Sequence, residues 1–275
     1  MNAMEELLSK EHMVLKECKH GHMLFNKNDL FIGQSLSLYG EWCEAELELL
    51  KKYVKSGDVV LDVGANIGTH TLAFSKMVSP GGLVYAFEPQ VLVFQNLCAN
   101  VALNAVTNVY CKHKAIGKEK GKIFVPVMDW REQQNFGALR LGEYDQGEQV
   151  ELTTIDSIGL KKCELIKIDV EGMELEVLEG AKETIRKFKP ILFLENNSDS
   201  SKEIITKLLS MGYDAYWHIS GYYNAQNHFS NKENIFQSYR PEINLLCFPE
   251  PHECGLPRVQ GIEDSWNDAQ KRIKA

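Results

Sequence analysis

The sequence predicts an α/β protein built on a mostly parallel sheet with helices on its faces. Short, continuously apolar runs recur along the chain, as expected for strands that are buried on both faces. Segments with helical periodicity, about 10–15 residues long, separate these runs and indicate β-α-β units. Glycine turns such as Gly57 and Pro80-Gly81-Gly82 stand between several of the segments.

The composition is that of a folded domain. Hydrophobic residues make up 44% of the 275-residue chain and charged residues 25%, values that exclude a disordered, collagen-like or coiled-coil protein. The length suits one large domain with small extensions. We expect a β-rich extension at 1–40, the main domain at 41–250 and a tail at 251–275.

Charge, apolar run length and cysteine usage narrow the class of protein. The net charge of −8 argues against nucleic-acid binding, which usually needs a basic surface. No apolar run approaches the roughly 18–20 residues that cross a bilayer, and Glu5 and Glu6 stand where a signal peptide carries bases. The seven cysteines are scattered and contain no C-x-x-C pair, which indicates reduced thiols in a cytoplasmic protein.

The N-terminal segment is the least helical part of the sequence. Strands are expected at 12–19 and 22–26 around His20-Gly21, and a third short strand at 30–32. Two roles are open for the strands at 12–32: they cover the active site, or they pair with a second copy of the chain in a homo-oligomer. From Trp42 the periodicity becomes helical.

The remaining chain supplies the sheet and its covering helices. The expected strands are 59–63, 83–87, 109–116, 166–170, 191–194, 215–219 and 243–248. The helices between them are expected at 67–78, 91–105, 177–188 and 204–209. Ligands of such sheets bind beyond the carboxyl ends of the strands, so the residues just after each strand are the candidates for a site.

The first strand of the sheet is followed by a glycine turn. Gly64 lets the backbone bend sharply and lets a ligand approach closely, and Gly68 lets the next helix pack near the strand. Asn66 stands where a dinucleotide-binding turn would carry its second glycine, so the spacing favours a ligand without a pyrophosphate. An ordinary tight strand-helix turn is the alternative.

The second strand ends at Glu88, 24 residues after Gly64. An acid about 20 residues after a glycine turn typically accepts hydrogen bonds from ribose hydroxyls. The turn and the acid together indicate a cofactor that contains a nucleoside.

Acids and amides also follow two later strands, as Asp169 and Glu171 after one and Glu195 and Asn196 after the other. Asp169, Glu195 and Asn196 offer oxygen ligands for a hard divalent cation. Equally, one of them could act as a general base while the others form hydrogen bonds to the substrate. A cap for the following helix is the structural alternative for Glu195 and Asn196.

Four blocks resemble the signature blocks of the FkbM-like S-adenosylmethionine-dependent methyltransferases, and the resemblance spans about 28–250. The blocks are Val59 to Gly68, Tyr85 to Pro89, Lys167 to Glu174 and Pro190 to Asn196. The resemblance implies the Rossmann-like class I methyltransferase fold, a seven-stranded sheet with one antiparallel edge strand and helices on both faces. It also implies methylation of a hydroxyl oxygen, often on a sugar or secondary metabolite.

The resemblance assigns residues to the cofactor. The turn that surrounds its methionine part comprises Asp62, Gly64, Ala65, Asn66, Gly68 and Thr69. Glu88 would hold the ribose, Asp169 would lie near the reacting methyl group, and the adenine would contact Pro89, Gln90, Lys114 and Ala115. The segment that approaches the main domain adds Tyr39 and Glu41.

An alcohol needs a base beside it before it attacks a sulfonium methyl group. Asp169 or Glu171 is our hypothesis for this base, with His70, His113 and His218 in reserve. Acceptor contacts are expected from the polar insertion at 126–150, whose alternative is a solvated hairpin. The substrate-binding candidates are Trp130, Arg131, Asn135, Arg140, Glu195 and Asn196.

The sequence therefore predicts an S-adenosylmethionine-dependent O-methyltransferase that acts on a saccharide or small-molecule hydroxyl, without a nucleic-acid partner or a membrane span. N-methylation of a small amine and a catalytically silent cofactor-binding module are the alternatives. A nicotinamide-dependent oxidoreductase conflicts with Asn66 and the spacing of Gly64 and Gly68. A divalent metal stays open as a second cofactor.

Overall fold

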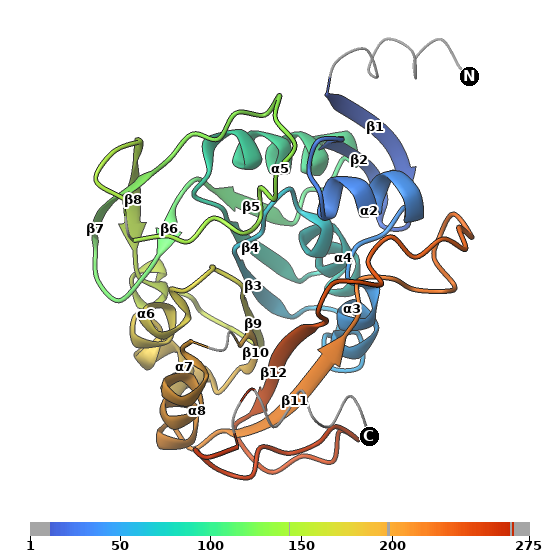
Figure 1. Cartoon of the computed structure of the whole chain (residues 1–275). Helices are drawn as coiled ribbons and strands as arrows, with labels where there is room; N and C mark the ends of the chain where they lie inside the picture. Colours follow the sequence, from blue (N-terminus) through green and yellow to red (C-terminus); the bar gives the residue numbers. More distant parts are fainter. Residues whose placement is uncertain (1–11, 143, 197–198, 265, 267–275) are drawn as a thin grey trace.

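The computed structural model describes residues 12–142, 144–196, 199–264 and 266, and its centre is one seven-stranded sheet (Figure 1). From edge to edge the strands are β11 (Asp214–Ser220), β12 (Glu242–Phe248), β10 (Ile191–Glu195), β9 (Leu165–Ile168), β3 (Val59–Val63), β4 (Leu83–Phe87) and β5 (Val109–Lys112). The order runs outward from β3 in both directions, so the sheet reverses between β3 and β9. The predicted Rossmann-like α/β class is confirmed.

The antiparallel strand lies one place in from the edge, which corrects its expected position at the edge. β12 pairs antiparallel with β10 on one side and with β11 on the other, while the other pairs of the sheet are parallel. Every residue of β12 from Ile243 to Phe248 is buried, as an interior strand requires. Because β12 runs against its neighbours, its first residues reach the edge where the parallel strands end.

Helices cover both faces of the sheet, in two groups (Figure 1). Alternate strand residues such as Val60 and Leu61 point to opposite faces and join different apolar clusters. One face carries α6 (Glu174–Glu179), α7 (Lys182–Phe188) and α8 (Ser201–Ser210). The other carries α3 (Glu44–Leu50), α4 (Thr69–Met77) and α5 (Val91–Leu103).

The N-terminal hairpin is present, but the third strand expected at 30–32 is wrong. β1 (Met13–Cys18) and β2 (Gly21–Asn26) pair antiparallel, and the chain then forms the helix α2 (Ile32–Tyr39). Ile32, Leu36 and Tyr39 are buried along one side of α2 at helical spacing. Gly33 lets α2 lie directly on β2, since a Cβ there would stand 2.0 Å from the Asn26 carbonyl oxygen.

Two expected elements are divided in the structure. The strand expected at 109–116 ends at Lys112, and β6 (Ala115–Ile116) joins a small separate sheet with β7 (Gly121–Val125) and β8 (Glu148–Thr153). The helix expected at 177–188 is split into α6 and α7 at Gly180, which packs against the chain after β6. A Cβ on Gly180 would lie 2.0 Å from the Gly117 carbonyl oxygen.

In the part of the chain that the structure describes, none of the helices combines the length and the apolar character that a bilayer crossing needs. All seven cysteines lie in that part and are free.

The hairpin is joined to the main domain through Asn100 of α5, which is fully buried. Its Oδ1 accepts from the Leu24 N–H at 2.6 Å, and its Nδ2 donates to the carbonyls of Leu24 and Ile67. Asn100→Ala should lower the free energy of unfolding by about 1–3 kcal/mol, because it leaves buried backbone groups without partners. Urea denaturation measures this loss.

Asn104→Ala is the matched control on the same helix. Asn104 makes equivalent bonds to His22, but these lie in solvent, where water replaces them. Equal losses for the two variants would contradict a buried anchor at Asn100.

Candidate functional site

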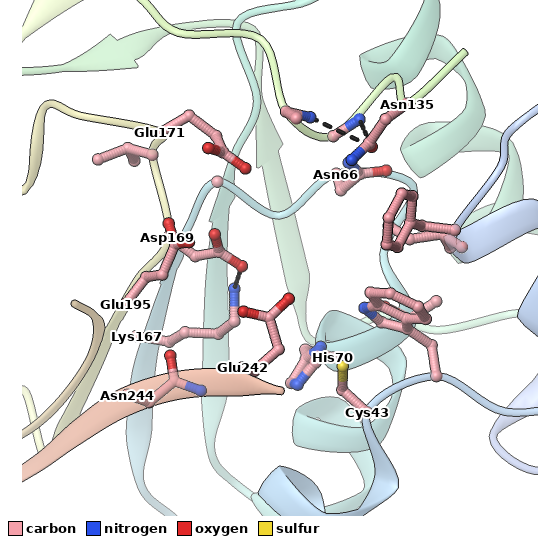
Figure 2. Close-up of a pocket in the computed structure, with 18 of the residues that line it drawn as sticks. Cys43, Asn66, His70, Asn135, Lys167, Asp169, Glu171, Glu195, Glu242 and Asn244 are labelled. Carbon is pink, nitrogen blue, oxygen red and sulfur yellow. Dashed lines mark hydrogen bonds and ion pairs between the residues drawn. The ribbon is translucent and has the colours of Figure 1, made fainter. Parts of the chain in front are cut away.

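A cavity of about 330 Å³ lies beyond the carboxyl ends of β3, β4, β9 and β10 (Figure 2). Its volume is at the lower end of the roughly 300–1,000 Å³ typical of ligand pockets. The turns after the four strands form one wall. The chain around the start of α3, the start of α4 and the connection between β11 and β12 form the rest.

The glycine turn after β3 is joined directly to the acid after β4. The N–H groups of Gly64 and Ala65 donate to the Phe87 carbonyl at 3.0 and 2.9 Å. The Glu88 carboxylate then accepts from the Asn66 N–H at 3.0 Å and from the Gln90 N–H at 2.8 Å. The two features that indicated a nucleoside cofactor therefore form one continuous wall of the cavity.

Gly64 cannot be replaced by a residue with a side chain without moving the backbone. Its φ is 80°, and a Cβ there would stand 1.7 Å from the Asp169 carbonyl oxygen. The bend therefore brings the exits of β3 and β9 into backbone contact, and the Asp169 N–H donates to the Val63 carbonyl at 3.0 Å.

Glu88 is only 3% exposed, and burial raises its pKa to about 7 although two backbone N–H groups oppose the shift. A carboxylate offers about four acceptor positions. After the bonds to Asn66 and Gln90, Glu88 therefore still has acceptor capacity for two hydroxyl groups.

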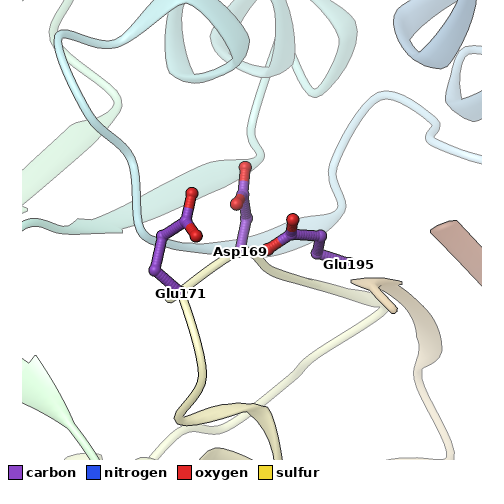
Figure 3. Close-up of side chains that lie close together, drawn as sticks. All are labelled: Asp169, Glu171 and Glu195. Atoms are coloured by element: carbon purple, nitrogen blue, oxygen red, sulfur yellow. The ribbon is translucent and has the colours of Figure 1, made fainter. Parts of the chain in front are cut away.

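Three carboxylates converge on the other side of the turn (Figure 3). Asp169 follows β9, Glu171 comes two residues later, and Glu195 ends β10; each offers one oxygen within 4.8 Å of the others. Glu171 has a φ of 51°, which is uncommon for a residue with a Cβ, and the following Gly172 has a φ of 103°. This turn directs the Glu171 carboxylate back towards Asp169.

Burial and mutual repulsion change the acidity of these groups. Burial, followed by the negative charges of Asp169 and Glu242, raises the pKa of Glu171 to about 8. Burial, followed by the charges of Asp169 and Glu171, raises the pKa of Glu195 well above its usual value. Burial, followed by the charges of Glu46 and Asp169, raises the pKa of Glu242 to about 7. The site thus holds several carboxyl groups that exchange protons near neutral pH.

Lys167 is the buried cation of this cluster. Its Nζ lies 3.0 Å from Asp169 Oδ2 and 3.6 Å from Asp62 Oδ1, and Thr71 donates to the other oxygen of Asp62 at 2.6 Å. Burial lowers the pKa of Lys167, but the carboxylates of Asp169 and Asp62 outweigh burial and raise it above the usual value. Asp62 itself is fully buried and does not line the cavity, so it contributes to the site through its charge and its contact with Lys167.

The opposite wall joins a histidine to the antiparallel strand. Glu46 of α3 contacts His70 Nε2 at 3.1 Å and accepts from Asn244 Nδ2 of β12 at 2.9 Å. Beside them Trp42 and Tyr222 stack with ring centroids 5.3 Å apart. The cavity therefore has an acidic wall facing a histidine and an aromatic surface (Figure 2).

Most of the predicted site residues line this one cavity. They are Gly64, Ala65, Asn66, Thr69, His70, Glu88, Pro89, Gln90, Asn135, Asp169, Glu171, Glu195 and Asn196. Of the candidates in the polar insertion, Asn135 is the one that lines the cavity.

Two residues of the approach segment lie outside the cavity, against their expected place beside the cofactor. The Tyr39 hydroxyl donates to the Glu233 carbonyl at 2.9 Å. The Glu41 carboxylate accepts from Asn224 Nδ2 at 2.7 Å and from the His228 N–H at 3.0 Å. Both residues hold the connection between β11 and β12.

Three further cofactor candidates do not line the cavity either. Gly68 precedes α4 as its N-cap, Lys114 pairs with Glu151 at the surface, and Ala115 is buried in the small sheet. Lys114 and Ala115 turn away because the chain leaves the main sheet after Lys112.

The other residues of the insertion that were expected to contact the methyl acceptor lie outside the cavity. Trp130 packs against Phe136, and Arg131 forms an exposed pair with Asp129 at 2.7 Å. Arg140 pairs with Asp199 at 3.6 Å and lies beside Gly172, next to the acidic cluster but outside the cavity lining.

The two histidines held in reserve are outside the cavity. His113 contacts the Pro89 carbonyl at 2.9 Å and stacks on Phe94, and His218 is buried against Phe193. His70 is the reserve histidine that lines the cavity.

Sequence reasoning missed several lining residues, among them Glu46, Lys167, Tyr222, Glu242 and Asn244. Lys167 stood inside a recognised block, two residues before Asp169, where alternation in a strand places both side chains on one side. Glu242 and Asn244 begin the antiparallel strand, so its direction was the signal that could have found them.

The comparisons with known proteins agree on one family. The family model described as Methyltransferase FkbM domain matches residues 62–215, more than half of the chain. Hexuronic acid methyltransferase AglP of Haloferax volcanii is 29% identical over 169 residues, which cover 60% of this chain and 66% of that protein. The 31-O-demethyl-FK506 methyltransferase FkbM of Streptomyces tacrolimicus is 32% identical over 162 residues, which cover 47% of this chain and 62% of that one.

The chain thus spans less than two thirds of the length of either relative. Among solved structures, the methyltransferase FkbM of Methylobacillus flagellatus KT is 17% identical with a TM-score of 0.45, covering 70% of this chain and 43% of that chain.

Lys167→Met should lower the free energy of unfolding by about 3–5 kcal/mol, because it leaves buried Asp62 without a countercharge. Lys162→Met is the matched control: Lys162 is 49% exposed, pairs with Asp58 and Glu164 at the surface, and should cost no more than about 1 kcal/mol. Urea denaturation at pH 7 compares the two, and equal losses would show that Lys167 is not the structural centre of the cluster.

Proposed function

Since the chain belongs to the FkbM methyltransferase family, we propose that it transfers a methyl group from S-adenosylmethionine to a hydroxyl of a saccharide or small-molecule metabolite. The observation that carries this proposal is the direct bond between the Asn66 N–H of the glycine turn and the Glu88 carboxylate. That bond lies at one end of a cavity whose other end holds the carboxylates of Asp169, Glu171 and Glu195.

The residues of the turn fit S-adenosylmethionine. Glu88 has two free acceptor positions for the two ribose hydroxyls, and Pro89 and Gln90 line the adjoining part of the cavity, where the adenine belongs. Gly64 and Ala65 leave room for the methionine part because neither carries a side chain beyond Cβ. This cofactor supplies a methyl group on a sulfonium whose thioether is a good leaving group.

The chain's own task is to align the acceptor, exclude water and take up a proton. Asp169 has the most accessible carboxylate of the acidic cluster, with 46% of its side chain exposed, and lies beside Gly64. Glu171, with a pKa of about 8, is the second candidate for the proton acceptor. His70 is a third, because Glu46 holds its Nε2 and leaves Nδ1 for the acceptor.

The aromatic surface supports an acceptor with a broad apolar face. Phe31, Trp42 and Tyr222 line the cavity opposite the acids, and such rings stack on the C–H faces of sugars and similar rings. The names of the two relatives, a hexuronic acid methyltransferase and a 31-O-demethyl-FK506 methyltransferase, support a hydroxyl-bearing acceptor of this kind.

N-methylation of an amine is the second candidate function, and the excess of carboxylates in the cavity favours it. A screen with S-adenosylmethionine carrying a labelled methyl group, run over glycans, hydroxylated metabolites and amines, separates the two. Transfer to amines alone would overturn the hydroxyl proposal.

Binding of S-adenosylhomocysteine should depend on pH through Glu88. Ribose hydroxyls donate to the ionised carboxylate, and a pKa of about 7 means that ionisation rises between pH 6 and pH 8. The affinity should therefore rise about tenfold over this range. Isothermal titration calorimetry at a series of pH values measures it.

Glu88→Gln should remove this pH dependence and weaken binding at pH 8 by about 10–100-fold, the cost of losing hydrogen bonds to a charged group. The exposed Glu151→Gln is the control and should bind like the parent. If the Glu88→Gln variant keeps both the affinity and the slope, Glu88 does not hold the ribose.

Loss of the proton acceptor should slow transfer while the cofactor still binds. Once the screen has identified an acceptor, Asp169→Asn or Glu171→Gln should lower the rate of methyl transfer about 100-fold or more, with S-adenosylhomocysteine affinity monitored in parallel. If both variants bind and turn over like the parent, the proton acceptor is not in the acidic cluster.

A further inference from the structure

The acidic cluster of Asp169, Glu171 and Glu195 gathers negative charge around one small volume. One carboxylate oxygen of each residue lies within 4.8 Å of the other two, and Figure 3 shows the three side chains pointing toward one another from the ends of two neighbouring strands. Oxygens that share one Mg²⁺ at about 2.1 Å stand no more than about 4.2 Å apart. A mutual separation within 4.8 Å is therefore close to that of a first coordination shell, and small side-chain movements would complete it.

The cavity around the cluster is short of positive charge. Among the described residues, two permanently cationic side chains line it, Lys167 and Arg240. The carboxylates that line it are Glu46, Glu88, Asp169, Glu171, Glu195 and Glu242. Lys167 is committed to Asp169 Oδ2 and to Asp62, and Arg240 lies over the ring of Trp266. Arg140, next to the cluster but outside the cavity lining, opposes the negative charge at Glu171 in part and also pairs with Asp199.

Two oxygen atoms at the end of β10 have no hydrogen-bond partner among the described residues. Glu195 Oε2 is buried, and Glu195 is a member of the cluster. Asn196 is 1% exposed and lines the same cavity; its Nδ2 donates to Ser201 Oγ at 2.9 Å, and its buried Oδ1 is left without a donor. Buried polar atoms without partners are rare in folded proteins, and an ion or water beside the two oxygens would satisfy them.

We propose that Asp169, Glu171 and Glu195 bind a divalent cation such as Mg²⁺ or Mn²⁺, which in turn holds two neighbouring oxygen atoms of the methyl acceptor. This inference rests on the proposed function and names its substrate class: an acceptor with vicinal hydroxyls, or with a hydroxyl beside a carboxylate. The donor set is oxygen alone, which suits these hard cations and not zinc.

The proposal accounts for the charge of the cavity. A divalent ion neutralises the mutual repulsion of the three carboxylates and makes a coordinated hydroxyl more acidic. With Asp169 and Glu171 on the ion, His70 is the proposed proton acceptor that stays free. Six coordination positions, with three or four filled by the protein, leave two or three, of which the acceptor needs two. An anionic acceptor would be repelled by this many carboxylates without such an ion.

Protons and an acceptor ammonium group are the other two occupants that would relieve the repulsion. They differ from a metal ion in a measurable way, because only a metal site binds Mn²⁺ in the absence of any acceptor. Metal binding also displaces protons, so the affinity of a metal site rises with pH.

The test is Mn²⁺ binding to the full chain, followed by electron paramagnetic resonance with and without S-adenosylhomocysteine. We expect one Mn²⁺ per chain, displaced by Mg²⁺. Glu195→Gln and Glu171→Gln should each weaken binding about tenfold or more, because even second-shell changes cost a metal site about 10–100-fold. Mn²⁺ should also broaden the proton signals of bound S-adenosylhomocysteine, since both lie in one cavity.

The controls separate this inference from the proposed function. Glu151→Gln, an exposed site remote from the cavity, should bind Mn²⁺ like the parent, and S-adenosylhomocysteine binding shows that each variant is folded. A protein that binds S-adenosylhomocysteine but not Mn²⁺, or whose Mn²⁺ affinity is unchanged in both Gln variants, overturns the metal site and leaves the proposed function standing. Mn²⁺ binding without S-adenosylhomocysteine binding supports the metal site alone and overturns the proposed function.

Discussion

The site depends on the contact between Gly64 and the backbone of Asp169. The contact is so close that only a glycine with a left-handed φ fits, and it brings the ends of β3 and β9 together where the sheet order reverses. The N–H groups of the same turn donate to the end of β4. Glu88 and Asp169 are therefore placed on either side of one bend, at positions set by backbone hydrogen bonds rather than by flexible side chains.

The sequence predicts the site residues that come just after the parallel strands. It does not predict the site residues that other elements bring to the cavity. Apolar runs locate β3, β4, β9 and β10, and this makes Gly64, Glu88, Asp169 and Glu195 candidates. Glu242 escapes such a pattern because it is the first residue of its strand, and only the antiparallel direction of β12 brings it to the site. The start of α2 resembles a strand in the sequence. Polar residues between Ile32, Leu36 and Tyr39 obscure the helical spacing of these buried apolar residues.

The carboxyl groups that line the cavity lower the stability of the folded chain when they ionise. Several carboxyl groups have pKa values raised by burial and by one another, and each costs folding energy once it ionises, because its charge is more favourable in the unfolded chain. Lys167 offsets part of this cost: it pairs with Asp62 and Asp169, and its charge opposes the rise in the pKa of Glu242. Such an uncompensated cluster is typical of a site that a ligand completes.

The segment before α3 acts on the site indirectly, through the connection between β11 and β12. Tyr39 and Glu41 bond to residues 224–235, and these bonds fix the long connection that ends in Arg240 and Glu242 and carries Tyr222 at its start. In the structure, Tyr39 and Glu41 therefore brace this connection. Glu41 is 5% exposed and accepts two hydrogen bonds from the connection, so the segment before α3 helps to hold the connection that carries Tyr222.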